Sequence, residues 1–261
     1  MRKPCSKKNF FYPDVKELET CVNNYEMENK YPEEQIYKFC VQEFSKNFKN
    51  IQEAKEELIK LIKFFLINWG SMGVLLNRKD KGGWERKVLD VLTKEHELFK
   101  KFTGVKIDEC EIGKMKYEIE KCYGKLKEVL GPTGASKILH LINPEFFPMW
   151  DSKIREKSKI KNDSEAYHNF LSKIKKCFFL NRQINETLEK LSEKYGKSKL
   201  KIIDEYMWWK VWKTKNLVRH AAKRNSNCKI EENGKKFYHN SSFRISFISL
   251  IFLGLRETCI P

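Results

Sequence analysis

Apolar residues recur at three- and four-residue steps along most of this chain, and this periodicity restricts the fold more than any other feature. In the clearest example, one apolar stripe is formed by Ala54, Leu58, Leu61, Ile62, Phe65, Leu66 and Trp69. Similar patterns predict further helices over 84–102, 115–129, 164–179, 184–195 and 200–222. Alternating patterns typical of strands are nearly absent. The sequence therefore predicts an all-α protein.

The character of the chain changes near residue 223. Residues 1–223 carry the helical periodicity and are expected to form one helical domain. Residues 224–240 are polar and rich in turn-forming Asn, and 241–261 are apolar without a clear period. The tail over 224–261 is therefore of uncertain structure, either a late-docking core element or an appendage.

The balance of charge is strongly basic. Lys and Arg number 52 against 35 Asp and Glu, which gives a formal net charge of +17. Such an excess favours a polyanionic partner, and double-stranded DNA is the partner we expect. The alternative is a lysine-rich solvated surface with no such partner. Lysine outnumbers arginine, which favours diffuse attraction to phosphates over base reading.

Cysteine usage and hydropathy indicate an intracellular protein. The 8 cysteines are scattered and contain no C-x-x-C pair, which favours reduced thiols over a metal site or an iron–sulfur cluster. The N-terminus lacks the apolar core of a secretion signal. The apolar stretch over 245–255 is shorter than the roughly 20 residues that cross a bilayer. We expect no membrane, metal or cofactor, and a location in the cytoplasm at the nucleoid or in a nucleus.

The segment over 130–151 carries most of the functional information. Gly131, Pro132 and Gly134 predict a hairpin-like turn at about 129–140, between two helices. Glycines let a backbone approach a phosphate closely, and the N-terminus of the next helix offers free N–H groups to an anion. The alternative is an ordinary corner between two helices.

Asp151 follows an aromatic loop over 146–150 and is expected to open the next helix. The simplest role for it is that of an N-cap, for which aspartate is among the best residues. Its apolar flank and the prolines before it also favour a carboxylate held in a fixed direction. Both roles remain open at this point.

The run LGPTGASK at 130–137, followed by FPMWD at 147–151, resembles the helix-hairpin-helix DNA glycosylase superfamily. Its members combine a hairpin of the form L-P-G-[VI]-G-x-K-T-A with an apolar helix and F-P-[VI]-x-D. The resemblance implies a two-lobed helical bundle in which the hairpin grips a DNA phosphate. By position, Asp151 matches the catalytic aspartate and Gly134 matches the second hairpin glycine.

The resemblance also implies a set of DNA contacts, which are Gly131, Thr133, Gly134, Ala135, Ser136, Lys137 and Lys153. The lysine that makes some members bifunctional falls on Ser136 in this chain. Lys137 lies one residue later, turned about 100° around the helix. We therefore expect a monofunctional enzyme that uses water, and Lys137 as a Schiff-base nucleophile is the less favoured variant.

The implied reaction removes a damaged or modified base from DNA. The enzyme flips the nucleotide out of the duplex, which costs a few kcal/mol of stacking that pocket contacts offset. As the base departs, the sugar acquires oxocarbenium character, and the carboxylate of Asp151 stabilises this charge or orients water. The protein is expected to act as a monomer without a cofactor.

Aromatic and titratable residues elsewhere are candidates for a base pocket. They are Trp69, Trp150, Trp208 and His140, and each has core packing as its alternative. His140 in particular has the pattern of a satisfied interior histidine. Asp204 is either a second carboxylate of the site or a charge in the first turn of its helix.

Two other functions stay open. One is a basic helical protein that binds DNA without catalysis, with Asp151 only as a helix cap. The other is a relative on the same fold that modifies bases or acts on RNA.

Overall fold

The computed structural model describes residues 11–28, 33–69, 72, 83–159 and 161–211. All of them belong to the first of two units of the chain, Met1–Leu217. Their regular structure is helical without any strand, which confirms the all-α prediction for this part of the protein. The end of the helix expected over 200–222 and the tail over 224–261 lie outside the described residues.

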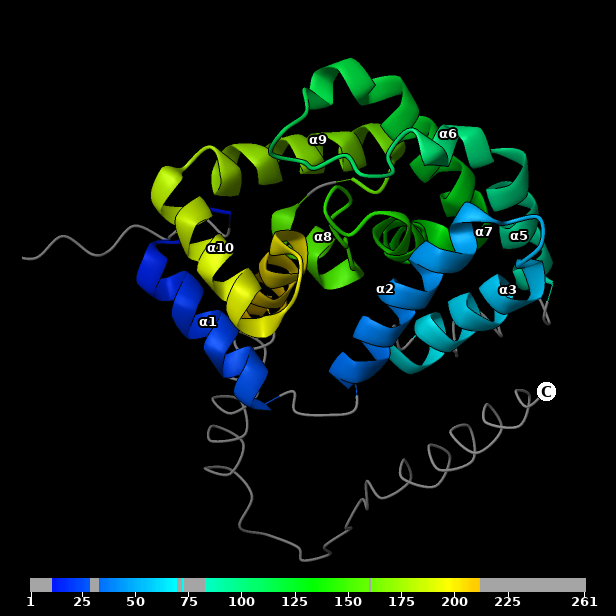
Figure 1. Ribbon diagram of the computed structural model, residues 1–261. Coiled ribbons are helices and arrows are strands. Elements are labelled where there is room, and N and C mark those ends of the chain that lie inside the picture. The colour runs from blue at the N-terminus through cyan, green and yellow to red at the C-terminus, as the bar shows by residue number, and fades with distance from the viewer. Residues whose placement is uncertain (1–10, 29–32, 70–71, 73–82, 160, 212–261) are drawn as a thin grey trace, which may run out of the picture. The chain divides into compact units, whose positions relative to one another are not determined.

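The elements of the first half of the chain (Figure 1) are α1 (Val15–Glu28), α2 (Glu33–Lys49), α3 (Lys55–Phe64), the π-helix η1 (Phe65–Trp69), α5 (Trp84–Lys94) and α6 (His96–Lys100). The second half has η2 (Ile112–Met115), α7 (Lys116–Ile142), α8 (Ser152–Ser158), α9 (Ser164–Ile174), the π-helix η3 (Lys175–Phe179) and α10 (Arg182–Tyr195). A last described helix covers 199–211. None of the described helices is long and apolar enough to span a membrane.

α7 is the central helix, because it packs against α2, α5 and α9. In its second half almost every residue from Leu130 to Ile142 is buried, including the polar Ser136, Lys137 and His140. Elsewhere α1 lies beside α10 and α2 beside α3 (Figure 1). The fold thus brings α1, near the start of the described chain, next to α10, near its end.

A one-residue kink replaces the hairpin-like turn expected at about 129–140. α7 continues from Lys116 to Ile142, and only Gly131 departs from helical geometry, with φ 74° and ψ 175°. This backbone region is accessible almost only to glycine. Pro132 then occupies the start of the new helical segment, where its missing N–H removes no hydrogen bond.

Gly134 allows close packing inside α7. A Cβ at this position would lie 2.6 Å from Leu130 Cβ and 3.2 Å from Met72 Cε, both too close without a shift of the neighbours. The glycine therefore serves the packing of the helix against its surroundings, and it is buried. The backbone at Gly134 is therefore not exposed to a phosphate.

Replacement of Gly131 by alanine should destabilise the fold. The Cβ forces an L-residue into the glycine region of φ and ψ, which costs about 1–3 kcal/mol in the free energy of unfolding. Urea denaturation of both proteins measures this difference. Gly113→Ala is the control, because a Cβ there meets nothing within 4 Å. Equal losses in the two variants would contradict a special role for the kink.

Candidate functional site

Asp151 is fixed at the start of α8. Its Oδ1 accepts hydrogen bonds from the backbone N–H groups of Lys153 and Ile154, each at 2.9 Å, so the N-cap role is shown. The residue is half-buried, in contrast to the fully exposed Asp163 that caps α9. The cap orients one carboxylate oxygen and thereby sets the direction of the other.

The loop that leads to Asp151 is held by side chains from two helices. Ser136 Oγ accepts from the backbone N–H of Trp150 at 3.0 Å. His140 Nδ1 lies 2.7 Å from the carbonyl oxygen of Phe147, and the hydroxyl of Tyr167 donates to the carbonyl of Pro148 at 2.9 Å. These bonds satisfy buried backbone groups and fix the loop, so Asp151 has a defined position relative to α7.

Lys137 has a buried amine on which the charge of Asp151 acts. The residue is only 9% exposed, and its Nζ lies 5.1 Å from the centre of the Trp69 ring. Burial lowers the pKa of Lys137, because the charged form loses its hydration. The negative charges of Asp151 and Asp204 act against this shift, and the positive charge of Lys201 adds to it. We call Lys137, Asp151, Asp204 and Trp69 the candidate site.

Trp69 belongs to the π-helix η1, an element that is rare and frequently found at functional sites. Its ring stacks on Phe65 with the centroids 4.9 Å apart and the planes 8° apart. Tyr37 lies 5.5 Å away at 42°, and Lys201 Nζ lies 5.4 Å from the ring centre. Two lysine ammonium groups, those of Lys137 and Lys201, therefore share one indole.

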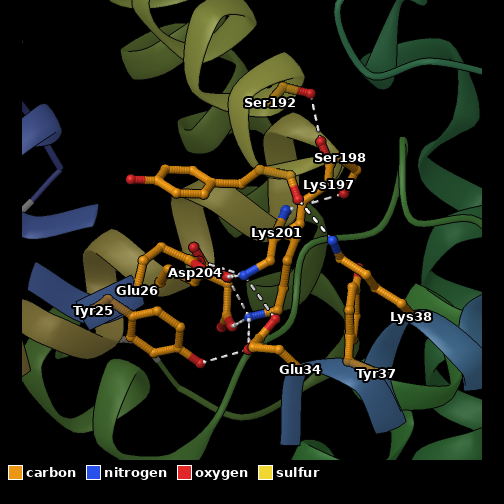
Figure 2. A network of polar contacts seen from close by, with 12 residues as sticks. Tyr25, Glu26, Glu34, Tyr37, Lys38, Ser192, Lys197, Ser198, Lys201 and Asp204 are labelled. Atoms are coloured by element: carbon orange, nitrogen blue, oxygen red, sulfur yellow. Dashed lines mark hydrogen bonds and ion pairs between the residues drawn. The ribbon is translucent and has the colours of Figure 1, made fainter. Parts of the chain in front are cut away.

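An ionic network adjoins Asp204 of the candidate site (Figure 2). It consists of Glu26, Glu34, Lys197, Lys201 and Glu205. Lys197 Nζ lies 2.7 Å from both Glu34 Oε2 and Glu205 Oε1, and it also pairs with Glu26. Lys201 Nζ lies 2.8 Å from Glu205 Oε1 and 3.3 Å from Glu34 Oε1. The side chains of Lys201 and Glu205 have no exposed surface.

Burial and pairing act in opposite directions on the groups of this network. For Lys201, burial disfavours the charge, but Glu205, Tyr25 and Glu34 outweigh it and raise the pKa well above its usual value. For Glu205, burial is the stronger effect and raises the pKa to about 7, although Lys201 and Lys197 oppose it. Burial also opposes ionisation of Glu34, yet the two lysines bring its pKa to about 2. The charged forms of Lys201 and Glu34 are thus stabilised by the opposite charges around them.

Asp204 lies on the same helix as Lys201 and Glu205 of this network. Its Oδ2 is 3.9 Å from Lys201 Nζ, and it interacts electrostatically with Asp151 and Lys137. Burial raises the pKa of Asp204 to about 6, and the charges of Asp151 and Glu34 add to the rise, while Lys201 and Lys137 oppose it. The site thus contains two carboxylates and one amine.

The residues expected to contact DNA lie mostly in the core. The buried ones are Gly131, Gly134, Ala135, Ser136 and Lys137. Thr133 is half-buried and accepts a hydrogen bond from Arg155 at 3.1 Å, and Lys153 is exposed. This differs from the exposed hairpin that the resemblance implies, because the second half of α7 is surrounded by α2, α5 and α9.

Trp69 is the base-pocket candidate whose ring lies under the amine of Lys137. Trp150 has no exposed surface and stacks on Phe170 at 5.4 Å, so it belongs to the core. Trp208 packs edge-on against Tyr25, at 5.5 Å between the centroids. His140 is buried with both nitrogens bonded, Nε2 to the hydroxyl of Tyr37 at 2.8 Å.

Sequence reasoning missed the ionic network entirely. A signal was present, because Lys201 and Glu205 stand one turn apart on a helix whose other residues are mostly apolar. Glu34, however, lies 167 residues away from Lys201, and no local pattern connects the two. Among the described residues, no group of three or more His, Cys, Asp and Glu is arranged to hold a metal ion.

Acid should destabilise the protein through His140. Burial lowers the pKa of this histidine from 6.5 to about 4, and the positive charge of Lys201 adds to the shift, although the bond to Phe147 opposes it. The unfolded chain binds this proton at a higher pH than the folded chain does. The stability contributed by the neutral His140 is therefore fully present above pH 6.5 and is lost as the pH falls through about 4.

Denaturation of wild type and His140→Gln at several pH values measures this effect. At pH 8 the difference in the free energy of unfolding reports only the lost hydrogen bonds. Towards pH 4 the difference should shrink by about 3 kcal/mol. Parallel pH curves for the two proteins would contradict the assignment.

No family model, curated protein or solved structure matches this chain. The position of each side chain in the candidate site is therefore the basis for any conclusion about function.

Proposed function

We propose that the chain is a DNA N-glycosylase, which flips a damaged or modified base out of the duplex and hydrolyses its N-glycosidic bond. The observation that supports this most is that the charge of Asp151, a carboxylate held by a helix cap, acts on the buried amine of Lys137. Burial lowers the pKa of this amine. The helix-hairpin-helix glycosylases, which the segment over 130–151 resembles, carry their aspartate at the corresponding helix start.

Asp151 supplies the negative charge that the reaction needs. Cleavage of the base–sugar bond leaves positive charge on the sugar, and a carboxylate fixed nearby stabilises it without reorganising. The two N–H groups of α8 hold Asp151 in place, and the bonded loop before it prevents movement. Water then attacks the sugar carbon, and the carboxylate orients it.

Lys137 adds a second possibility at the same site. Burial lowers the pKa of Lys137 and thereby favours its neutral amine, which is a nucleophile. The monofunctional reaction with water remains the one we propose. The sequence position of Lys137, one residue after that of the family lysine, does not favour the Schiff-base variant. Burial of the amine does favour it, because burial lowers the pKa of Lys137.

The proposal includes double-stranded DNA as the partner, a monomeric protein, and the two-lobed arrangement of the glycosylase family. The net charge of +17 supports attraction to phosphates. Among the residues expected to contact DNA, Lys153 is the best placed to bind a phosphate. It is exposed in the first turn of α8, two residues from Asp151. In this arrangement the kinked α7 takes the place of the hairpin and its following helix.

Asp151→Asn should abolish base excision. Asparagine keeps the helix cap but removes the charge, so the rate should fall on the order of 100-fold or more. The assay incubates full-length protein with a panel of lesion-bearing duplexes and measures strand breaks after alkali treatment. DNA affinity of the variant should remain close to that of wild type.

Asp163→Asn is the matched control, because Asp163 caps α9 in the same way. It should leave excision unchanged. Activity that survives in Asp151→Asn, or no excision on any duplex by wild type, would overturn the glycosylase proposal. Tight, salt-sensitive DNA binding without excision would instead support the non-catalytic alternative.

Borohydride trapping decides the role of Lys137. If water is the nucleophile, incubation with an abasic duplex and sodium borohydride yields no covalent protein–DNA product. If the amine attacks, a stable product forms, and Lys137→Gln removes it. A product that persists in Lys137→Gln would exclude Lys137 as the nucleophile and point to another amine.

A further inference from the structure

α8 and the residues that follow it carry a dense group of cations. Four lysines lie close together in sequence, and they are Lys153, Lys157, Lys159 and Lys161. All four are exposed. The only acidic residue between the first and the last of them is Glu156. We call these four lysines the α8 basic surface.

The ammonium groups of the α8 basic surface form no ion pair or hydrogen bond with another described residue. The stretch over 194–201 is equally rich in lysine, and there each ammonium group bonds to a carboxylate or amide oxygen. The lysines of that stretch are Lys194, Lys197, Lys199 and Lys201. In contrast to them, the α8 basic surface keeps its charge free for a partner outside the described chain.

The other side of α8 fixes the helix to the protein. Ile154 is buried, and Arg155 donates a hydrogen bond to the hydroxyl of Thr133 at 3.1 Å. Lys153 and Lys157 are one helical turn apart and both are exposed, so they share the outer face of α8. The chain from residue 157 to residue 161 spans at most about 14 Å, which keeps the other two lysines close to this face.

Two of the four lysines occupy positions at which the fold does not favour lysine. Lys159 ends α8 with φ 53° and ψ 35°, and it is the only described residue other than glycine with a positive φ. Gly196 ends α10 with similar angles, as is usual because a Cβ is strained there. Lys153 lies in the first turn of α8, where the helix dipole disfavours a cation. Local stability therefore does not account for either lysine.

We propose that the α8 basic surface binds the phosphodiester backbone of duplex DNA. Exposed ammonium groups on an anchored helix attract phosphates whatever the base sequence. Lys153 is two residues from Asp151, so DNA that binds here passes the helix start that carries the carboxylate. The surface takes the role that the resemblance gives to the buried second half of α7. Only the identity of the partner as DNA rests on the proposed function.

The test replaces all four lysines by glutamine in the full-length protein. The affinity for a fluorescein-labelled duplex without lesions is measured at several salt concentrations. At physiological salt the affinity should fall on the order of 10-fold or more. The slope of log affinity against log salt should flatten by about 0.9 for each lysine that contacts a phosphate. Replacement of the same four lysines by arginine retains the charge and should preserve both quantities.

The matched control removes the same amount of charge from another exposed region, in which each lysine already pairs with a glutamate. Its glutamine substitutions are at Lys100, Lys101, Lys106 and Lys114. The affinity of this control should fall less than about 3-fold. Equal losses in the two variants, or a wild type that does not bind the duplex, would overturn the proposal. Binding to phosphatidylserine vesicles but not to DNA would assign the surface to a membrane instead.

Lys159→Gly separates binding from folding. Glycine adopts the backbone angles of this position without strain, so the thermal midpoint of unfolding should stay the same or rise. The affinity for the duplex should fall by a few fold, because one cation is lost. A lower midpoint with unchanged affinity would show that Lys159 serves the fold and would contradict its place in the surface.

Excision by the same proteins keeps the two proposals apart. A wild type that binds through the four lysines but excises no base refutes the glycosylase proposal alone. A wild type that excises, together with a glutamine variant of unchanged affinity, refutes the α8 basic surface alone.

Discussion

Lys201 carries its charge at a position without exposed surface, and the arrangement around it depends on compensating that charge. An unpaired ammonium in the interior would cost several kcal/mol, so carboxylates must come to it. Glu205 arrives from the same helix and Glu34 from the start of α2. Lys197 adds Glu26 from α1 to the same group. The ionic network thereby ties three helices from opposite ends of the described chain to one another.

The candidate site occupies the edge of this network. Trp69 receives both Lys201 and Lys137 on its ring, and Asp204 lies next to Lys201 of the network. Asp151 is held by the cap of α8 and by a loop to which side chains of α7 and α9 form hydrogen bonds. A rigid surrounding is what a charged catalytic group requires, because its charge then needs no reorganisation during the reaction.

Local features were predictable because they depend on neighbours in sequence. The helices over 164–179 and 184–195 are present as α9 with η3 and as α10, and Asp151 caps α8. Local patterns did not predict the kink at Gly131. A Gly-Pro pair is equally typical of a turn and of the start of a helical segment. The same holds for η1, because the i→i+5 hydrogen bonds of a π-helix leave no distinct pattern in the sequence.

The sequence by itself determined the all-α class of the described part, most helix positions and the capping aspartate. These follow from periodicity and from hydrogen bonds within a few residues. Tertiary structure alone decided that Lys137 would be a buried amine under the influence of Asp151 and Asp204, and that the glycines before it would pack inside the protein. Burial and the distance between charges set both outcomes, and these arise only when segments far apart in the chain come together.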